Sequence, residues 1–404
     1  MRNKRRIVVT GLGVISSIGT GKDGFWKALT AGKSGVSKIT SFDTEGFRCK
    51  YGGEIKDFDP AAFIPKRKTR FLGKTSQLAI AGAHLALEDA KLNPSAIDSK
   101  KFGIIFGTTV GERPMEELIE SWAKGGLKEV DRTRVLQAAV HNIPANVGIQ
   151  FKAMGLNCLI PTACAAGNYA IGYGYDLIRK GDLNFILAGG AEAFSHVAYV
   201  GFQRLYSMAP EKPQPFDKNR KGLILGEGAG VILLESLESA LKRNAKIYAE
   251  VLGYGLSCDA YHITAPDPKG VANVMKKAIK DAGLSTRDVD YICAHGTGTP
   301  TNDKVECAAI KDVFADYKVP VSSVKSMLGH PMGAASAIEA AVCCLVIENS
   351  LIPPTINYET PDPECDIDCV PNTARKKEVK IVLNNGFAFG GNNCCVVFGS
   401  LNNK

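Results

Sequence analysis

Short apolar runs alternate along the chain with longer segments of helical periodicity. The runs are rich in valine and isoleucine and often end at glycine, as in residues 7–11, Ile-Val-Val-Thr-Gly. The longer segments repeat apolar residues every three or four positions, as in residues 77–91 and 270–282. Short buried strands followed by amphipathic helices are typical of βα units, so the pattern predicts an α/β fold with covered sheets.

The order of strand-like runs occurs twice, which indicates two duplicated halves. Three runs in the first half correspond in order to three in the second: residues 102–109 to 290–297, 184–190 to 380–386, and 230–236 to 394–400. The halves meet near residues 237–250 without a flexible linker, so we expect units of residues 1–245 and 246–404. A functional site is expected where the halves meet.

Composition and charge narrow the classes of partner. The 404 residues are 45% hydrophobic and 22% charged, as in an ordinary folded protein. The formal charge of +8 arises from local clusters, chiefly Lys66, Arg67, Lys68 and Arg70, which favour an acidic protein partner. Nucleic-acid binding would predict aromatic residues among the cations or a known recognition motif, and neither occurs.

No segment is expected to cross a membrane. The apolar run after the basic start is too short for a signal peptide, and the apolar helix near residues 340–347 is flanked by Glu339 and Glu348. We expect a cytoplasmic protein whose twelve cysteines are reduced, although Cys365 and Cys369 could bridge. No CxxC or HExxH motif occurs, so no metal site is predicted.

Cys164 is the candidate nucleophile. It lies in Pro-Thr-Ala-Cys-Ala-Ala-Gly, residues 161–167, where a strand is expected to pass into a helix. The free N–H groups and dipole at a helix start favour a thiolate and can hold an oxyanion, while small neighbours leave room for a substrate. The alternative for such a residue is a buried structural cysteine, so the residues that lie near Cys164 decide between the two interpretations.

Two histidines and a lysine of the second half are those candidate partners. His295 follows a predicted strand in Cys-Ala-His-Gly-Thr-Gly-Thr, and His330 ends Lys-Ser-Met-Leu-Gly-His, where Lys325 could bias imidazole protonation. The internal repeat pairs the His330 segment with the Cys164 segment, so we expect Cys164, His295 and His330 to converge.

Other histidines and a glycine-rich loop receive different interpretations. His84, His141 and His196 have no glycine-rich context, so we interpret them as structural or surface residues. Residues 386–393, Gly-Phe-Ala-Phe-Gly-Gly-Asn-Asn, place an aromatic residue among glycines that permit movement, which is typical of a gate.

With these motifs in view, the chain closely resembles the β-ketoacyl-acyl-carrier-protein synthase II family, the elongating condensing enzymes on the thiolase fold. The resemblance covers essentially the whole chain. It includes Thr-Ala-Cys at 162–164, Pro-Phe-Asp-Lys-Asn-Arg at 215–220, Leu-Gly-Glu-Gly-Ala-Gly at 225–230 and Asp-Ala-Tyr-His-Ile-Thr at 259–264, besides the two histidine motifs. It implies duplicated halves that form a layered α-β-α-β-α core.

The resemblance also implies the chemistry. Cys164 would accept an acyl chain from a carrier protein as a thioester, and malonyl carrier protein would lose CO2 and extend that chain by two carbons. His295 and His330 would donate hydrogen bonds to the malonyl thioester carbonyl. His295 would also activate water or position the departing carboxylate. Lys325 would support this charge pattern and pair with Glu339.

Further roles follow from the same resemblance. Phe389 would gate the site and, with Cys164, supply backbone N–H groups to an oxyanion hole. The arm of the carrier protein, phosphopantetheine, would lie against Thr297, Thr299 and Thr264, and no other cofactor is implied. The carrier protein itself would meet a basic surface comprising Lys66, Arg67, Lys68, Arg70 and Arg204. Family members are homodimers, so we expect a homodimer.

The loop after Gly107 departs from the family pattern. It reads Thr-Thr-Val-Gly-Glu-Arg-Pro, with the charges of Glu112 and Arg113 where glycine and aliphatic residues are usual near the acyl pocket. The gate also has Ala388 and Asn392 where glycine and threonine are usual. These changes raise an alternative, a ketosynthase of a specialised polyketide or polyene pathway, in which a homologous chain-length subunit would complete a heterodimer.

Three other classes fit less well. A catalytically silent chain-length subunit would lack the nucleophile that Cys164 provides. A degradative thiolase would need a second catalytic cysteine. An initiating synthase would carry asparagine where this chain has His330.

Overall fold

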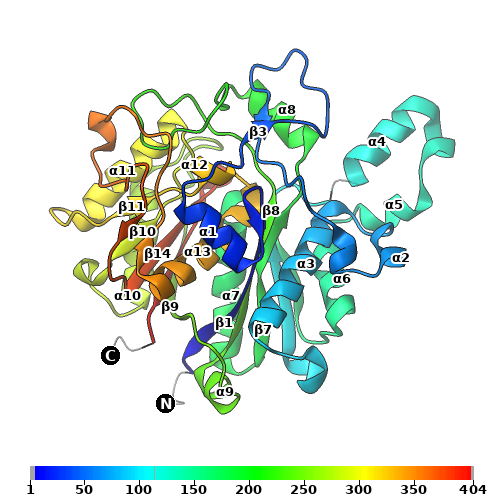
Figure 1. Cartoon of the computed structure of the whole chain (residues 1–404), viewed down its shortest axis with the longest axis horizontal. Coiled ribbons are helices and arrows are strands. Elements are labelled where there is room, and N and C mark those ends of the chain that lie inside the picture. Colours follow the sequence, from blue (N-terminus) through cyan, green and yellow to red (C-terminus); the bar gives the residue numbers. More distant parts are fainter. Residues whose placement is uncertain (1–4, 113, 402–404) are drawn as a thin grey trace.

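One mixed β-sheet runs through the computed structural model, which describes residues 5–112 and 114–401 (Figure 1). Its first half has the strand order β6-β5-β7-β8-β1 and its second half β9-β15-β14-β10-β11. The strands of the first half are β1 (Ile7–Ser16), β5 (Phe102–Gly107), β6 (Asn157–Ile160), β7 (Phe185–Glu192) and β8 (Gly228–Ser236). Those of the second half are β9 (Ala249–Cys258), β10 (Tyr291–Cys293), β11 (Val321–Ser322), β14 (Ile381–Phe387) and β15 (Asn392–Gly399).

The strand order confirms the internal repeat predicted from the sequence. In each half, counted from the outer edge of the sheet inward, the first two pairs of neighbouring strands are parallel and the next two pairs are antiparallel. The strands β5, β7 and β8 correspond to β10, β14 and β15, as the three sequence correspondences require. The halves join where Ile7, Val8 and Val9 of β1 pair with β9.

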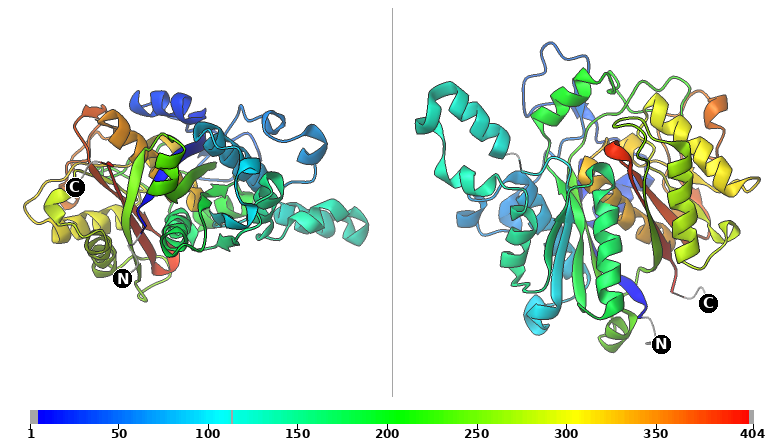
Figure 2. Two further views of the ribbon diagram at one scale, coloured as in Figure 1. Left: turned by 90° about the horizontal axis from the view of Figure 1, so that it is seen from below. Right: turned by 180° about the vertical axis from the view of Figure 1, so that it is seen from behind.

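Helices cover both faces of each half, so the predicted layered α/β fold is confirmed (Figure 2). The helices α3 (Lys74–Asp89) and α6 (Asn142–Phe151) lie outside the first half, and α10 (Pro268–Asp281) and α11 (Pro300–Phe314) lie outside the second. Between the halves, α7 (Ala166–Lys180) packs against α13 (Ala335–Asn349). The helices expected at residues 77–91 and 270–282 are α3 and α10.

The remaining elements are shorter. The α-helices are α1 (Lys22–Thr30), α2 (Lys66–Thr69), α4 (Pro114–Gly125), α5 (Arg132–Gln137), α8 (His196–Arg204), α9 (Leu237–Lys242) and α12 (Lys325–Leu328). The short strands are β2 (Gly19–Thr20), β3 (Ser37–Lys38), β4 (Tyr51–Gly52), β12 (Leu351–Ile352) and β13 (Arg375–Lys376). The 3₁₀ turns are η1 (Pro60–Ala62), η2 (Pro94–Ala96), η3 (Ser99–Lys101), η4 (Gly126–Glu129), η5 (Ala163–Ala165), η6 (Thr286–Asp288), η7 (Met332–Ala334), η8 (Pro363–Cys365) and η9 (Phe389–Gly391). Helices α4 and α5 form an arm that projects from the body (Figures 1 and 2).

The apolar helix near the C-terminus belongs to the core. The stretch Met332–Asn349 is long and apolar enough to cross a membrane, but 83% of it is buried within the protein. It packs between the two halves as η7 and α13. The twelve cysteines are all free, so Cys365 and Cys369 do not bridge.

Small residues allow α7 and α13 to approach closely. A Cβ atom placed on Gly167 would lie 2.6 Å from the backbone nitrogen of Ala337 and 2.9 Å from Oγ of Ser336. Likewise, a Cβ on Gly230 of β8 would lie 2.3 Å from the nitrogen of Ile338. Since α7 begins beside Cys164 and α13 beside His330, this contact sets the spacing of the two halves at the site.

We therefore expect the substitution Gly167→Ala to destabilise the protein. The added methyl group meets backbone and Cβ of α13, which have no free space to enter, and overpacking of this kind costs about 1–3 kcal/mol. Urea unfolding measures the change. Gly24→Ala is the matched control, because Gly24 lies in α1 with nothing within 4 Å of its added methyl, and it should be neutral or slightly stabilising. Equal stability of Gly167→Ala and wild type would contradict the close contact.

Candidate active site

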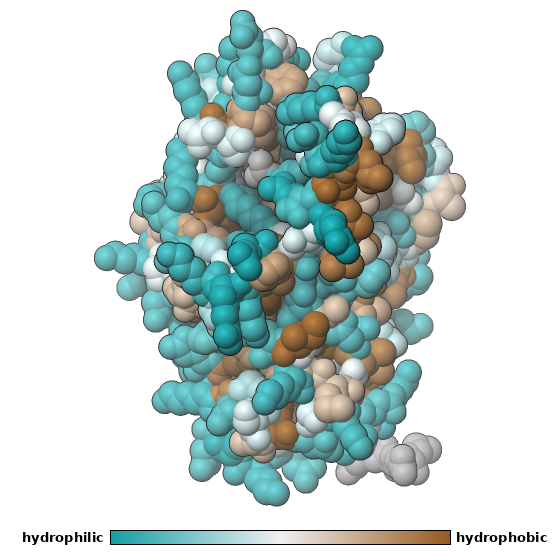
Figure 3. Space-filling view, turned by 90° about the vertical axis from the view of Figure 1, so that its right-hand side faces the viewer, coloured by the Kyte–Doolittle hydropathy of each residue, from teal (hydrophilic) through white to brown (hydrophobic). Residues whose placement is uncertain are grey.

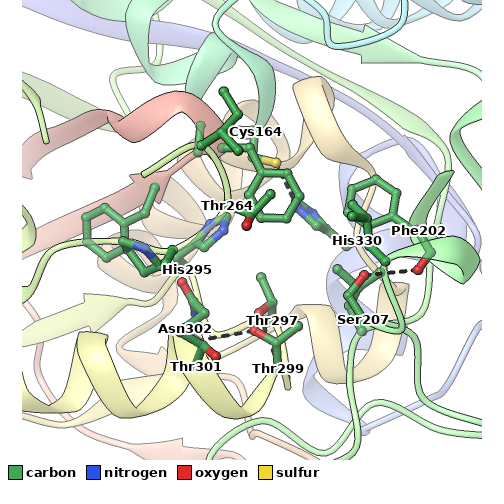
Figure 4. A pocket seen from close by; sticks show the side chains of 18 of the residues that line it. Cys164, Phe202, Ser207, Thr264, His295, Thr297, Thr299, Thr301, Asn302 and His330 are labelled. Carbon is green, nitrogen blue, oxygen red and sulfur yellow. Dashed lines mark hydrogen bonds between the residues drawn. The ribbon is translucent and has the colours of Figure 1, made fainter. Parts of the chain in front are cut away.

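A cavity of about 360 Å³ opens between the two halves and contains the three predicted chemical groups (Figure 4). Cys164, His295 and His330 all line it. The sulfur of Cys164 and one ring nitrogen of each histidine lie within 4.8 Å of one another. The convergence predicted from the internal repeat is therefore present in the structure.

Cys164 sits in the turn η5, immediately before α7. Its neighbours Ala165 and Ala166 are buried, and a Cβ on Gly107 would lie 2.4 Å from the carbonyl carbon of Ala166, so backbone closes the space beneath the cysteine. Cys164 is itself only 7% exposed, and its sulfur lies 3.1 Å from Nε2 of His330. The thiol thus reaches the cavity from an otherwise apolar wall.

The expectation that the helix start favours a thiolate is wrong for the resting site. Burial raises the pKa of Cys164 to about 12, and the positive charge of Lys325 lowers it by a smaller amount. Desolvation of a charged sulfur in this apolar wall outweighs the favourable charges nearby. Cys164 is consequently a thiol at neutral pH, and its proton must leave during the reaction.

The two imidazoles are neutral for a related reason. Burial lowers the pKa of His295 and of His330 well below 6.5, and the Lys325 ammonium lowers both further. Their rings meet edge to face, with centroids 5.4 Å apart and planes at 84°. Neutral imidazoles present one N–H donor each, so the pair can donate hydrogen bonds to a single oxygen atom.

Lys325 and Glu339 form a buried ion pair beside these imidazoles. Each side chain is 1% exposed, and Nζ of Lys325 donates to Oε1 of Glu339, which lies on α13. Burial raises the pKa of Glu339 to about 7. One thiol and two imidazoles are donors that could ligate zinc, but the ammonium gives the cavity a positive potential that favours anions over a dication.

Glu306 positions His295 and was not identified from the sequence. Its carboxylate, buried on α11, accepts from the backbone nitrogens of His295 at 2.9 Å and Gly296 at 2.7 Å. It also accepts from Nδ2 of Asn385 at 3.1 Å. Glu306 leaves no distinctive signal in the sequence, because the groups it holds in this loop are backbone N–H groups.

Glu192 positions the loop of residues 108–111 beneath the cavity in the same way, and it was not identified from the sequence either. This wholly buried carboxylate ends β7 and accepts from the backbone nitrogens of Thr109, Val110 and Gly333, at 2.6, 3.0 and 3.0 Å. It thereby ties residues 108–111 to the turn that follows His330. The available signal was an acidic residue at the end of a buried Gly-Gly-Ala-Glu run.

The three predicted substrate-binding threonines line the cavity. Thr297 and Thr299 lie side by side, with their hydroxyl oxygens 2.9 Å apart, and Thr264 is labelled between Cys164 and this pair in the view of Figure 4. The backbone nitrogen of Thr264 donates to Nδ1 of His262 at 3.1 Å. His262, which the sequence analysis did not single out, also lines the cavity.

The predicted gate lies at the cavity mouth. Phe389 lines the cavity, is 38% exposed and stacks on Phe202 of α8, with ring centroids 5.7 Å apart. The next two residues, Gly390 and Gly391, have φ angles of +81° and +74°, which favour glycine. The ring that contacts His295 belongs instead to Phe387, at 5.8 Å between centroids.

Glu112 does not line this cavity. Its Oε1 accepts from the backbone nitrogen of Ser76 at 3.0 Å and from the Ser76 hydroxyl, at the start of α3. Burial raises the pKa of Glu112 to about 7. The carboxylate of Glu112, which the sequence predicted near an acyl pocket, is therefore directed at the start of α3. Arg113, the other charged residue of that loop, lies outside the described residues.

The five predicted carrier-contacting residues do not line the cavity either. Lys66, Arg67, Lys68 and Arg70 are exposed on and after α2, which lies beside α3 and α6 in Figure 1. Arg204 is exposed at the end of α8, next to the lining residues Leu205 and Tyr206. Only Arg204 is thus adjacent to the mouth, and the contact of all five with a carrier protein stays a prediction.

Comparisons with known proteins agree with this geometry. Residues 4–240 match the Beta-ketoacyl synthase, N-terminal domain, and residues 248–359 match the corresponding C-terminal domain. The 3-oxoacyl-[acyl-carrier-protein] synthase 2 proteins of Coxiella burnetii and Synechocystis are 41% and 39% identical, each over 98% of both chains.

Solved structures give the same result. The ishigamide ketosynthase/chain length factor superposes with a TM-score of 0.96 at 45% identity, covering 98% of this chain and 100% of that chain. A type II polyketide ketosynthase bound to its acyl-carrier protein, AntDE:AntF, gives 0.91 at 34% identity, covering 99% and 100%. Since the family domains, the full-length relatives and the fold all agree, this chain belongs to the β-ketoacyl synthase family.

Proposed function

We propose that this protein is an elongating β-ketoacyl-acyl-carrier-protein synthase, which extends an acyl chain by two carbons through decarboxylative condensation with a malonyl thioester. The observation that carries the proposal is the meeting of one thiol with two neutral imidazoles in a single buried cavity. The full-length relatives named 3-oxoacyl-[acyl-carrier-protein] synthase 2 support the same reaction.

The first step transfers the acyl chain to Cys164. The sulfur attacks the thioester carbonyl, the bond from that carbon to the carrier's sulfur breaks, and the carrier thiol leaves with the proton that Cys164 gives up. An N–H at Nε2 of His330, 3.1 Å from the sulfur, is placed to stabilise the thiolate while this proton moves to the carrier's sulfur. Backbone N–H groups of Cys164 and Phe389 are our candidates for the oxyanion hole of this step.

The second step forms the carbon–carbon bond. The malonyl thioester loses CO2, and its enolate carbon attacks the Cys164 thioester, which releases the cysteine sulfur and consumes one proton. His295 and His330 donate N–H groups to the thioester oxygen on which negative charge develops. Being neutral, they stabilise this charge without surrendering a proton, and the Lys325 ammonium adds a positive potential from behind.

The substrates reach the cavity on the phosphopantetheine arm of an acyl carrier protein, against Thr264, Thr297 and Thr299. No further cofactor or metal takes part in the steps above. The basic residues Lys66 to Arg70 and Arg204 are our candidates for contact with the acidic carrier in the cytoplasm. AntDE:AntF, in which a ketosynthase is bound to its acyl-carrier protein, supports a carrier partner.

The projecting arm formed by α4 and α5 supports the proposal of a dimer. Helices α4 and α5 and the turn between them expose Ile119 by 59%, Trp122 by 64%, Leu127 by 82% and Leu136 by 74%. Figure 3 shows apolar side chains scattered among polar ones on the face that carries the arm. Apolar groups so exposed mark an interaction surface, and β6 is an edge strand of the sheet that is able to pair with another strand.

A specific observation favours a second candidate within the same chemistry. The ishigamide ketosynthase/chain length factor, at 45% identity, is more similar to this chain than the 38–41% of the named 3-oxoacyl synthases above. A ketosynthase of a specialised polyketide or polyene pathway would share Cys164, His295 and His330. It would differ in the acyl chains it extends and in its partner subunit.

Alkylation should report the raised pKa of Cys164. Only the thiolate reacts with iodoacetamide, and because the pKa is about 12, the thiolate fraction rises about tenfold per pH unit at every pH below that. We expect the rate of Cys164 modification, followed by peptide mass spectrometry, to climb steadily from pH 7 to 9. Cys164→Ala identifies the signal among the other cysteines. A rate that levels off below pH 8 would show that the helix start has lowered the pKa after all.

Product mass spectrometry tests the reaction itself. The protein is incubated with malonyl carrier protein and with acyl carrier proteins of short to long, saturated and unsaturated chains. Extension of ordinary saturated chains, lost in Cys164→Ala, is expected of a fatty acid elongation enzyme. Extension of short or unsaturated chains alone, or only with a partner subunit, would favour the specialised pathway. No extension under any condition would exclude both.

From the exposed apolar residues of α4 and α5 we predict a dimer that one added charge disrupts. Trp122→Asp places a carboxylate in the apolar surface, and we expect light scattering to find wild type as a dimer and this variant as a monomer. Leu241→Asp is the matched control, because Leu241 is 58% exposed on α9, away from the arm, and its variant should remain a dimer. If Trp122→Asp dimerises like wild type, the arm is not the interface; a wild type that dimerises only with a homologous chain supports the heterodimer.

A further inference from the structure

Asn302 is a polar residue of the cavity that neither the motifs nor the comparisons assign. It lies in the first turn of α11, lines the cavity and is labelled beside Thr297 and Thr299 in Figure 4. Its backbone nitrogen donates to Oγ1 of Thr299 at 3.3 Å, which ties it to the threonine pair. The side chain is partly exposed, so its free atoms can meet a ligand.

Asp303 fixes the orientation of the Asn302 amide. The wholly buried Asp303 accepts from Gly298 N at 3.2 Å through Oδ1 and from Phe216 N at 2.8 Å through Oδ2. Nδ2 of Asn302 donates to the same Oδ1 at 3.1 Å. A carboxylate that accepts backbone N–H groups cannot donate to an amide oxygen, so the NH2 group faces Asp303. The other polar atom of this side-chain amide is Oδ1, which accepts no hydrogen bond from the described residues.

The threonine pair leaves one donor beside that acceptor. Thr297 and Thr299 share a hydrogen bond between their hydroxyls at 2.9 Å, which uses one of their two hydroxyl protons. Oγ1 of Thr299 also accepts from Asn302 N, and Oγ1 of Thr297 accepts from Thr299 N at 3.3 Å. Whichever hydroxyl donates within the pair, the other proton remains free. This part of the cavity therefore offers one free donor and one fixed acceptor.

We propose that Asn302 is a specificity residue for the substrate's pantetheine arm and accepts the N–H of one of its two secondary amides. Oδ1 of Asn302 accepts that N–H, and the free threonine hydroxyl donates to a different acceptor of the arm, because the N–H and C=O of one trans amide point in opposite directions. The proposal rests on the proposed function, which brings a pantetheine thioester into this cavity. The resemblance assigns the threonines to this arm, whereas the acceptor role of Asn302 follows from its contact with Asp303.

A site built this way selects against thioesters that lack the amide. An acceptor fixed by a buried carboxylate cannot turn away, so a ligand without an N–H leaves Oδ1 unpaired in the complex. Asn302 thus acts as a specificity residue for the carrier arm and holds the thioester at a set depth, without contacting the reacting atoms.

The test measures the rate of Cys164 acylation by intact-protein mass spectrometry. The acyl donors are hexanoyl-pantetheine and two analogues, each with an ester oxygen in place of one of its two amide N–H groups. In wild type we expect one analogue to react about tenfold more slowly than the parent, the effect of one hydrogen bond. In Asn302→Leu the parent should already be slowed to a similar degree, and that same analogue should cause no further loss.

Two controls separate this proposal from the proposed function. The hexanoyl thioester of 2-mercaptoethanol has no amide, so wild type and Asn302→Leu should react with it equally. If neither this donor nor hexanoyl-pantetheine acylates wild-type Cys164, the proposed function fails instead. Lys304→Ala, an exposed neighbour on α11, should behave as wild type with every donor. The proposal is overturned if neither analogue slows wild type, or if the penalty persists unchanged in Asn302→Leu.

Discussion

The contact between α7 and α13 is the constraint on which the site depends. Gly167 leaves room for the backbone of Ala337, and the backbone nitrogen of Asn168 donates to Oγ of Ser336 at 3.0 Å. Asn384 of β14 joins the same cluster through Nδ2, which donates to Oδ1 of Asn168 and to the carbonyl of Ser336. These buried bonds link the halves with little freedom of register. Because Cys164 precedes one helix and His330 the other, a shift between the helices would move sulfur and imidazole apart.

Burial dominates the pKa values of the thiol, the two imidazoles and Glu339 at this point. It raises the pKa of the thiol to about 12 and that of Glu339 to about 7, and it lowers those of both imidazoles. A buried ion pair such as that of Lys325 and Glu339 contributes little to stability, because desolvation of both charges offsets their attraction. The ammonium acts instead on the imidazoles, whose pKa values it lowers further than burial alone does, and on any negative charge that develops between them.

The sequence predicted the symmetric part of the molecule well, because strands and helix starts leave local patterns. Periodicity gave α3 and α10, and the internal repeat gave the correspondence of β5, β7 and β8 with their counterparts and hence the convergence of Cys164 with His330. The state of the thiol was mispredicted, since a helix start is a local feature whereas desolvation depends on the packing of both halves. Glu192 and Glu306 escaped notice for a related reason. Their partners are backbone N–H groups of loops distant in sequence, which carry no side-chain signature.

Those two carboxylates explain how a duplicated fold can carry asymmetric chemistry. The loops after β5 and β10 occupy equivalent places, and both turn buried backbone N–H groups inward. Glu192, from the end of β7, satisfies one loop, and Glu306, from α11, satisfies the other. An acceptor is required at each place because unpaired buried N–H groups are costly. The element that supplies the acceptor is not constrained by the repeat, and neither is the side chain that the loop presents. One loop therefore forms a wall under Cys164 while its counterpart presents His295 to the cavity.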